Sequence, residues 1–375
     1  MLSAGTDARR PAQVDPADGR SPAGRQHAGS AAVREPVAVG SAAGAAADRR
    51  AVVRGDPTRG VGRRRCVVPQ VRHRVGGVAR QCCGALGKWA NCQVAVSVHA
   101  ATDSASCPLE WELFLPEEWA RDDRRRRRAG IPDDVGHVSK TWLALGLLER
   151  LAEQGLEVPT IVADAGYGRS VSFRLALEER GWSYVVAVDP KEVARPAEAE
   201  PHQPVYGGLG PPTLPRYREA ARPLPCLVET GTGFEEVTWR QGSKGAMASR
   251  FAVIEVRPSG KVATRTAQEQ AGGRSRWDGV LPMRTMLVEQ PAEAAEPTGY
   301  WMTNLPPTTP VADLVRWAKM RWRIEHDYRE LKHGLGLDHF EGRTWRGWHH
   351  HVTLVTAAQA FLTLRRLDPK VGMPA

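Results

Sequence analysis

The sequence predicts a mixed α/β fold with an inserted β-rich region, preceded by a long N-terminal segment that is disordered. Three observations lead to this prediction. Between residues 92 and 188, short β-branched runs alternate with segments whose apolar residues have helical spacing. A stretch rich in Pro and Gly then leads to three more strand patterns, between residues 234 and 304. The first 80 residues show neither period and lack the residue types that build a core.

Residues 1–80 contain no Phe, Tyr, Trp, Ile, Asn or Lys, and Leu2 is their one leucine. A segment of this composition cannot bury enough apolar area to offset the entropy cost of ordering, so we expect residues 1–76 to be disordered. The segment also holds most of the charge. Its 15 Arg and 6 acidic residues give +9 of the chain's formal +10, which leaves +1 for residues 81–375. A basic arm that binds phosphates and a solvated tail both explain this composition.

Translation in the wrong frame of a GC-rich gene is a third explanation. With suitable codons, a shift of one base turns Arg25–Ser41 into GNMQALQQFVNQSPWDP, which has amphipathic spacing and aromatic residues. The same shift turns Arg63–Gly76 into VDDVSFPKFGTASV, a strand-like run with paired aspartates. We therefore interpret residues 1–76 as an out-of-frame segment. Short stretches such as Cys66–Val71 could still pair partially with a sheet, interrupted at Pro69.

Normal composition begins near Gln81. Apolar runs bounded by turn residues predict strands, and segments of helical spacing, several of them capped by Ser or Thr or stopped by Gly, predict helices. The strands are expected at Cys92–His99, Trp111–Leu115, Thr160–Ala163, Tyr184–Val188, Phe234–Pro258, Val280–Gln290 and Tyr300–Asn304, and the helices at Ser139–Gln154, Ser170–Arg180, Thr309–Lys332 and His351–Leu367. This order predicts a core of residues 77–189, a β-rich insertion of residues 190–305 and a C-terminal helical part of the core, residues 306–375.

Several classes of protein are not expected. No window approaches eighteen uncharged apolar residues, and the first thirty residues hold no apolar block with basic flanks, so we expect neither a membrane span nor a secretory signal. The six cysteines are irregularly spaced, which fits a reducing cytoplasm. An α/β hydrolase would need a nucleophile motif such as G-x-S-x-G, which the sequence lacks.

Asp164 is the first of two carboxylates that stand out. It follows the predicted strand Thr160–Ala163 and precedes Ala165-Gly166-Tyr167-Gly168. Ligands of α/β sheets gather beyond the carboxyl ends of strands, and glycines there allow a close approach of the backbone. An Asp at this position can equally well cap the helix that follows.

Glu325, the second carboxylate, lies on a predicted helix with two faces. Arg321, Glu325, Tyr328 and Lys332 are spaced to share one face, and Trp317, Met320, Ile324 and Leu331 form the opposing apolar stripe. An exposed helix with an Arg321–Glu325 ion pair explains this pattern. The same pattern also fits phosphoryl transfer. In that chemistry, carboxylates from separate elements hold two Mg²⁺ about 4 Å apart, and neighbouring Arg and Lys side chains bind the DNA phosphates.

The sequence around Glu325 resembles that of a known family. RWRIEHDYRELKHGLGLDHFEGR, with Arg321, Glu325 and Lys332, resembles the Y-x2-R-x3-E-x6-K signature of bacterial insertion-sequence transposases. VADAGYG around Asp164, LFLPEEWA, AGIPDDV and WHHHVTLVTAA look like the insertion sequence 701 branch of the DDE transposases. The resemblance covers about residues 77–367.

This resemblance implies a ribonuclease-H-like core with a β-rich insertion, and a DDE triad that uses Mg²⁺ or Mn²⁺ in a two-metal site. Asp164 and Glu325 would be the second and third acids and the metal ligands. Arg321, Lys332 and the neighbouring Arg323 would contact DNA. The implied partners are the terminal inverted repeats of a transposon, target DNA and a second copy of the chain in a synaptic complex. The implied location is the bacterial cytoplasm, at the nucleoid.

Two departures from the family pattern matter. Ala318 stands where the signature has Tyr, which removes a phosphate-contacting hydroxyl. The first catalytic Asp is expected shortly before Gly77, yet no Asp or Glu lies between Asp56 and Asp103. The shifted frame would supply VDDVSFPK there. We therefore expect a transposase with defective strand cleavage; a non-catalytic DNA-binding remnant is the alternative.

Other candidate residues have weaker signals. Trp301 resembles the position of a tryptophan that stacks on a flipped base in related transposases, although an aromatic residue in a strand usually packs in the core. His349, His350 and His351 point in different directions on a helix, so joint metal binding is not expected. Arg124–Arg128 could bind DNA or lie in a solvated loop. The last group, in which packing is the default and DNA contact the alternative, comprises Arg343, Trp345, Arg346 and Trp348.

Overall fold

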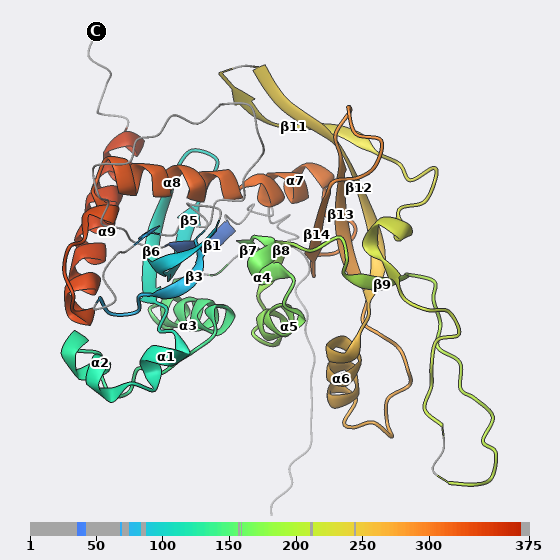
Figure 1. Cartoon of the computed structure of the whole chain (residues 1–375). Helices are drawn as coiled ribbons and strands as arrows, with labels where there is room; N and C mark the ends of the chain where they lie inside the picture. The colour runs from blue at the N-terminus through green and yellow to red at the C-terminus, as the bar shows by residue number, and fades with distance from the viewer. Residues whose placement is uncertain are drawn as a thin grey trace, which may run out of the picture. The chain divides into compact units, whose positions relative to one another are not determined.

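The computed structural model describes residues 36–42, 68–69, 75–83, 88–156, 158, 160–210, 213–243 and 245–368 (Figure 1). For residues 36–42, 68–69 and 83 only the backbone is described. All of these residues belong to one compact unit, Arg34–Ala375. Within them, no helix is long and apolar enough to cross a membrane.

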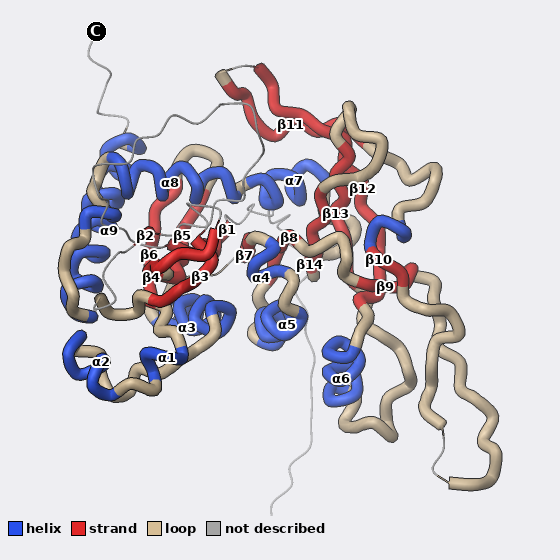
Figure 2. Tube along the Cα trace, viewed as in Figure 1, coloured by secondary structure: helices blue, strands red, loops and turns tan. Residues whose placement is uncertain are grey.

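A mixed sheet is the centre of this unit (Figure 2). Its strands follow the order β10-β9-β12-β13-β14-β8-β7-β1-β5-β6, with β11 paired to β12. Strands β1, β7 and β8 are mutually parallel, and the other pairs are antiparallel. The bounds are β1 Pro36–Ala42, β5 Ala95–Ala101, β6 Ser106–Leu113, β7 Thr160–Ala163, β8 Ser183–Ala187, β9 Val193–Pro196, β10 Arg222–Pro223, β11 Glu235–Gly242, β12 Gly245–Pro258, β13 Arg284–Gln290 and β14 Gly299–Thr303.

Helices cover both faces of the core strands. Because side chains alternate along a strand, Ile161 and Val186 pack with α3 (Lys140–Glu153) and α5 (Val171–Glu179), whereas Val162 and Val185 belong to the cluster of the C-terminal helices. The C-terminal helices are α7 (Val311–Lys319), α8 (Arg321–His333) and α9 (Trp345–Leu367). Figure 1 shows the two groups of helices on opposite sides of the sheet. The predicted mixed α/β class is confirmed.

The β-rich insertion continues the same sheet. Strand β14 pairs with β8 of the core, so β9–β14 extend the sheet rather than form a separate one. Helix α6 (Lys261–Gln270), which the sequence reasoning did not predict, lies between β12 and β13 along the chain. The boundaries of the insertion at residues 190 and 305 stay a prediction.

The N-terminal segment departs from expectation at two places. Strand β1 lies between β5 and β7, and β2 (Val68–Pro69) pairs with β4 (Lys88–Gln93) in a small sheet that also contains β3 (Ala79–Cys83). At these two places the structure has short strands within the segment for which disorder was predicted. Strands β5 and β7 each present backbone donors and acceptors to the position between them. Strand β1, with the sequence PVAVGSA, occupies this position and pairs with both. Most of residues 1–76 otherwise lie outside the described residues.

Three helices differ from their predictions. The long helix expected from Pro310 is interrupted: α7 ends at Lys319, Met320 lies between, and α8 begins at Arg321, with Pro310 itself at the N-cap position. Asp123–Ala129 is a helix (α2) rather than a loop, because Asp122 caps it by accepting a hydrogen bond from Arg125 N. Helix α9 begins at Trp345, where Thr344 accepts a hydrogen bond from Gly347 N, and not at His351.

Candidate functional site

Asp164 lies at the carboxyl end of β7. Its side chain caps the short helix α4 (Ala165–Gly168), with Oδ1 accepting a hydrogen bond of 2.7 Å from Gly166 N. Helix α4 packs so closely on β8 that a Cβ at Gly168 would lie 2.1 Å from the Ala187 carbonyl oxygen. Glycine at this position therefore fixes the approach of α4 to the sheet, and Asp164 is held at that edge.

The strand beside Asp164 supplies no carboxylate. In the parallel pairing of β1 with β7, Ala38 is opposite Val162 and Val39 is opposite Ala163. The whole of β1 reads PVAVGSA. The family pattern places the first catalytic Asp shortly before Gly77, but the strand that pairs with β7 here consists of residues 36–42, which contain no acidic residue.

Glu325 lies on the exposed side of α8. Its Oε1 is 3.0 Å from Arg321 Nη2, and 43% of its side chain is accessible. Among the described residues, no hydrogen bond or ion pair joins Glu325 to Asp164, and no three His, Cys, Asp or Glu side chains form a group suited to a metal ion. Asp164 and Glu325 therefore do not by themselves supply the set of carboxylate ligands that a two-metal site needs.

The core-facing side of α8 carries a buried polar network that the sequence reasoning missed. Asp327 accepts hydrogen bonds from Ser106 Oγ (2.6 Å) and pairs with His99 Nδ1 (2.9 Å). Tyr328 Oη lies 2.5 Å from Ser97 Oγ, which is also 2.9 Å from His99 Nε2. Tyr328 is therefore buried, and the prediction that it shares the exposed face with Arg321 is wrong. The spacing of polar and apolar residues along the helix does not indicate that the Tyr328 hydroxyl has a hydrogen-bond partner on β5.

This network raises the pKa of a neighbouring thiol. Burial first, and the Asp327 carboxylate second, raise the pKa of Cys107 to about 11. The thiol therefore stays protonated at neutral pH. Together, the contacts of Asp327 and Tyr328 fix α8 against β5 and β6 and so determine which residues of α8 face outward.

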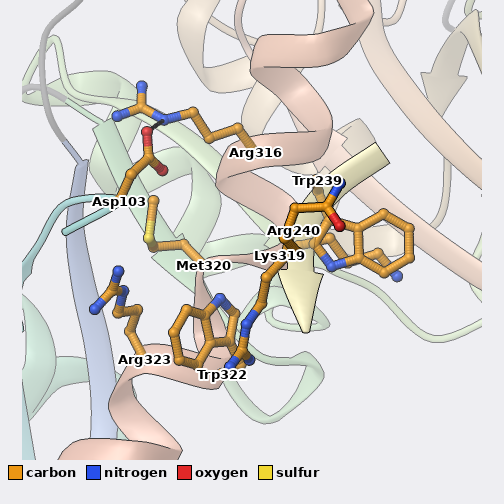
Figure 3. A pocket seen from close by; sticks show the side chains of 9 residues that line it. Asp103, Trp239, Arg240, Arg316, Lys319, Met320, Trp322 and Arg323 are labelled. Atoms are coloured by element: carbon orange, nitrogen blue, oxygen red, sulfur yellow. Dashed lines mark hydrogen bonds and ion pairs between the residues drawn. The ribbon is translucent and has the colours of Figure 1, made fainter. Parts of the chain in front are cut away.

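A cationic pocket opens beside the junction of α7 and α8. Its volume is about 320 Å³, and its lining comes from β11, from the end of α7, from the start of α8 and from the turn after β5: Asp103, Trp239, Arg240, Gln241, Arg316, Lys319, Met320, Trp322 and Arg323 (Figure 3). Four of these side chains are cations and one is an acid. Three tryptophans lie in or next to it, since Trp301 also contacts Lys319.

Two of the four cations are neutralised within the protein. Arg316 Nε pairs with Asp103 at 2.6 Å, and Lys319 Nζ pairs with Glu289 at 2.6 Å. Lys319 also lies 4.5 Å from the ring centre of Trp239 and 5.2 Å from that of Trp301. The structure thus places Trp301, half-buried in β14, under a lysine at the edge of this pocket.

The other two cations contact one aromatic ring. The guanidinium carbon of Arg240 is 3.7 Å from the ring centre of Trp322, and that of Arg323 is 4.5 Å from it. Burial lowers the pKa of Arg323, Asp327 and Asp103 act in the opposite direction, and the like charge of Arg240 lowers it further. Arg240 and Trp322 were not candidates from the sequence, because no local pattern links β11 to α8.

Two comparisons with known proteins bear on this arrangement. Residues 67–246 match the family model of the DDE superfamily endonucleases. A probable transposase for insertion sequence element IS701 from Microchaete diplosiphon is 32% identical over 112 residues. The chain resembles a DDE insertion-sequence transposase. The match covers 30% of this chain and 27% of the curated relative, so it spans about a quarter of that transposase's length.

The remaining transposase candidates occupy different places in the structure. Lys332 is half-buried in the last turn of α8, about two helical turns after Glu325. Ala318, at the tyrosine position of the signature, is buried in α7. Trp345 and Trp348 are buried in the core, whereas Arg343 and Arg346 are exposed.

The histidine and arginine runs have local partners. His349 Nδ1 is 3.0 Å from the carbonyl oxygen of Trp345, and His351 Nε2 is 3.0 Å from that of Gly336, so the two rings are engaged separately. Within Arg124–Arg128, the buried Arg126 donates to the carbonyl oxygens of Pro132 and Val135. One arginine of this run is therefore structural, and the solvated loop expected for the run is a helix.

Proposed function

We propose that this chain is a DNA-binding protein of the insertion-sequence transposase type in which strand cleavage is defective. Intact relatives are expected to cut and rejoin DNA at transposon ends with a DDE carboxylate triad and Mg²⁺ or Mn²⁺. The observation that carries the proposal is the contrast between Asp164, beside a strand without carboxylates, and the cationic pocket with its tryptophans. The DNA-binding part is present, and the carboxylate set is incomplete.

The cationic pocket supports DNA as the ligand. Residues 81–375 carry a formal charge of only +1, so a field from the whole protein does not explain binding. Local placement does: Arg240, Arg316, Lys319, Arg321 and Arg323 lie within or next to the pocket, where they suit a phosphate backbone. Lys332, farther along α8, and Trp301 are further proposed DNA contacts. Homodimer formation on DNA and association with the bacterial nucleoid are parts of the same proposal.

The carboxylates do not fit the two-metal chemistry that the family implies. Asp164 is engaged by Gly166 N, Glu325 is paired with Arg321, and no third acid lies beside them among the described residues. We therefore assign no metal-dependent step to this chain.

A frame shift in the gene accounts for this loss. With suitable codons, a frame-shifted translation of residues 63–76 contains paired aspartates, whereas the present translation gives RRRCVVPQVRHRVG. Sequencing the source gene tests the idea directly: the other frame must encode VDDVSFPKFGTASV and GNMQALQQFVNQSPWDP. A gene whose other frame encodes neither string contradicts it.

The function itself is tested with the purified full chain and labelled DNA that carries the repeats flanking the source gene. We expect binding at low salt, and no strand cleavage with Mg²⁺ or Mn²⁺. Absence of binding would contradict the DNA-binding role. Robust cleavage that disappears in Asp164→Ala would contradict the catalytic defect, because it would show that Asp164 works in a complete site. Cleavage that survives Asp164→Ala would indicate a contaminating nuclease.

A further inference from the structure

We propose that Arg240 of β11 and Arg323 of α8 form one binding site for a single backbone phosphate of DNA, with Trp322 holding both guanidinium groups in place. This inference rests on the proposed DNA-binding function and adds to it a defined site that joins the β-rich insertion to α8. The two arginines are 83 positions apart in the sequence and meet only in the folded chain.

The charges of the pocket single out these two residues. Arg316 and Lys319 are neutralised by Asp103 and Glu289. By contrast, no acidic side chain in the part of the chain that the structure describes lies within ion-pair distance of Arg240 or Arg323. Arg323 Nη1 donates to the Ser104 carbonyl oxygen at 3.1 Å, and no hydrogen bond to another described residue engages its Nη2. Within the described chain, two positive charges therefore share a pocket without an ion-pair partner, and Asp327 and Asp103 act on Arg323 only from beyond ion-pair distance.

The geometry suits one anion held by both. The two distances to the Trp322 ring set an upper limit of about 8 Å on the separation of the guanidinium carbons, whichever faces of the ring they occupy. In the proposed site, the two side chains reach one phosphate at the edge of the ring, each through hydrogen bonds of about 2.8 Å. The Trp322 ring restricts both side chains, so fewer rotamers are lost when the anion binds. Burial is the main reason why the pKa of Arg323 is lowered, and the like charge of Arg240 adds a smaller effect in the same direction. An anion bound between the two cations relieves their repulsion.

The sequence of the bound DNA is not read by such a site. Backbone phosphates are the same in every sequence, so the two arginines position the duplex and add affinity without specificity. The half-buried position of both side chains, between β11 and α8, also means that DNA binding would fix β11 against the helix that carries Glu325.

The test measures how DNA affinity depends on salt. Fluorescence anisotropy with a labelled duplex of arbitrary sequence gives the slope of log K against log [KCl] for the full wild-type chain, for the double variant Arg240→Gln/Arg323→Gln and for the control Arg265→Gln. Arg265 is an exposed arginine of α6, which lies at the opposite end of the insertion from β11 (Figure 1). One lost phosphate contact reduces the slope by about 1. We expect this reduction in the double variant and no change in the control.

Each other outcome overturns the inference. An unchanged slope in the folded double variant excludes a phosphate site, and a reduction of about 2 means that the arginines hold two separate phosphates. If the double variant does not fold, Arg240→Gln alone must weaken binding several-fold, since β11 reaches DNA through this residue. Arg240→Lys/Arg323→Lys keeps both charges and must keep most of the slope.

Two further observations separate the sources of failure. A wild-type chain that binds no DNA at low salt contradicts the proposed function and this site together, whereas wild-type binding with an unchanged double variant contradicts only the site. Millimolar inorganic phosphate at matched ionic strength should leave wild-type DNA affinity unchanged. A fall to the affinity of the double variant would assign the pocket to free phosphate instead of a DNA diester.

Discussion

The edge of the sheet at Asp164 and the cationic pocket at the α7–α8 junction lie in one fold but differ in completeness. At the edge, one carboxylate caps a helix beside a strand without acidic residues. In the pocket, cations from β11, α7 and α8 meet three tryptophans, and two of the cations have no acidic partner within the described chain. The edge depends on the N-terminal fifth of the chain and the pocket does not. Under the proposed function, damage confined to that fifth would remove catalysis and spare binding.

Loss of Asp327 should have the largest effect, because this carboxylate holds α8, and with it part of the pocket, against the sheet. Asp327→Ala leaves His99 Nδ1 and Ser106 Oγ buried without the carboxylate that they contact. Breaking a buried pair by removing one partner costs about 3–5 kcal/mol of unfolding free energy. Urea denaturation measures this loss. Glu325→Ala, on the exposed side of the same helix, should change stability by less than about 0.5 kcal/mol, and equal effects of the two variants would contradict the assigned faces of α8.

The packing of the Asp164 edge should be the next most sensitive feature. A Cβ at Gly168 meets the Ala187 carbonyl oxygen, so Gly168→Ala should lower the free energy of unfolding by about 3 kcal/mol. Gly146 of α3 is the matched control, because a Cβ there meets nothing within 4 Å. Gly146→Ala should stabilise the protein by about 0.5–1 kcal/mol through helix propensity. A neutral Gly168→Ala would show that α4 does not approach the sheet so closely.

Removing the charge of Glu325 should have the smallest effect, and a positive one. Glu325 pairs with Arg321 next to the pocket, so Glu325→Gln frees that arginine and deletes a negative charge. We expect DNA affinity to rise about two- to fivefold, a change of about 0.4–1 kcal/mol that is typical of an exposed pair. Glu269→Gln on α6, where Glu269 and Arg265 form an equivalent exposed i,i+4 pair, should leave it unchanged. Lower affinity in Glu325→Gln would argue against Arg321 as a DNA contact.

Local sequence signals predicted the parts of the fold that depend on local chemistry. The β-branched runs around Val96, Ile161 and Val185 are buried strands, and Ser139 and Ser170 cap α3 and α5 as their positions predicted. Glu325 and Arg321 were correctly placed on one exposed face of a helix.

Features that depend on contacts between distant segments could not be predicted in this way. Tyr328 has the spacing of the polar face, but its hydroxyl reaches Ser97 across the sheet. Arg240 lies in an unremarkable strand of the insertion until folding brings it to Trp322. Strand β1 has only Val, Ala, Gly, Ser and Pro, and its place in the sheet is determined by the neighbours β5 and β7, not by its own pattern.

The central claim is that DNA binding persists while strand cleavage is lost with the N-terminal acid. The most direct test compares this chain with a chain translated in the restored frame before Gly77, in one assay on the same labelled transposon-end DNA with Mg²⁺. We expect comparable binding by both chains, cleavage only by the restored one, and loss of that cleavage in its Asp164→Ala variant. Cleavage by the present chain, or none by a folded restored chain, would show that the N-terminal segment does not determine whether the protein cuts DNA.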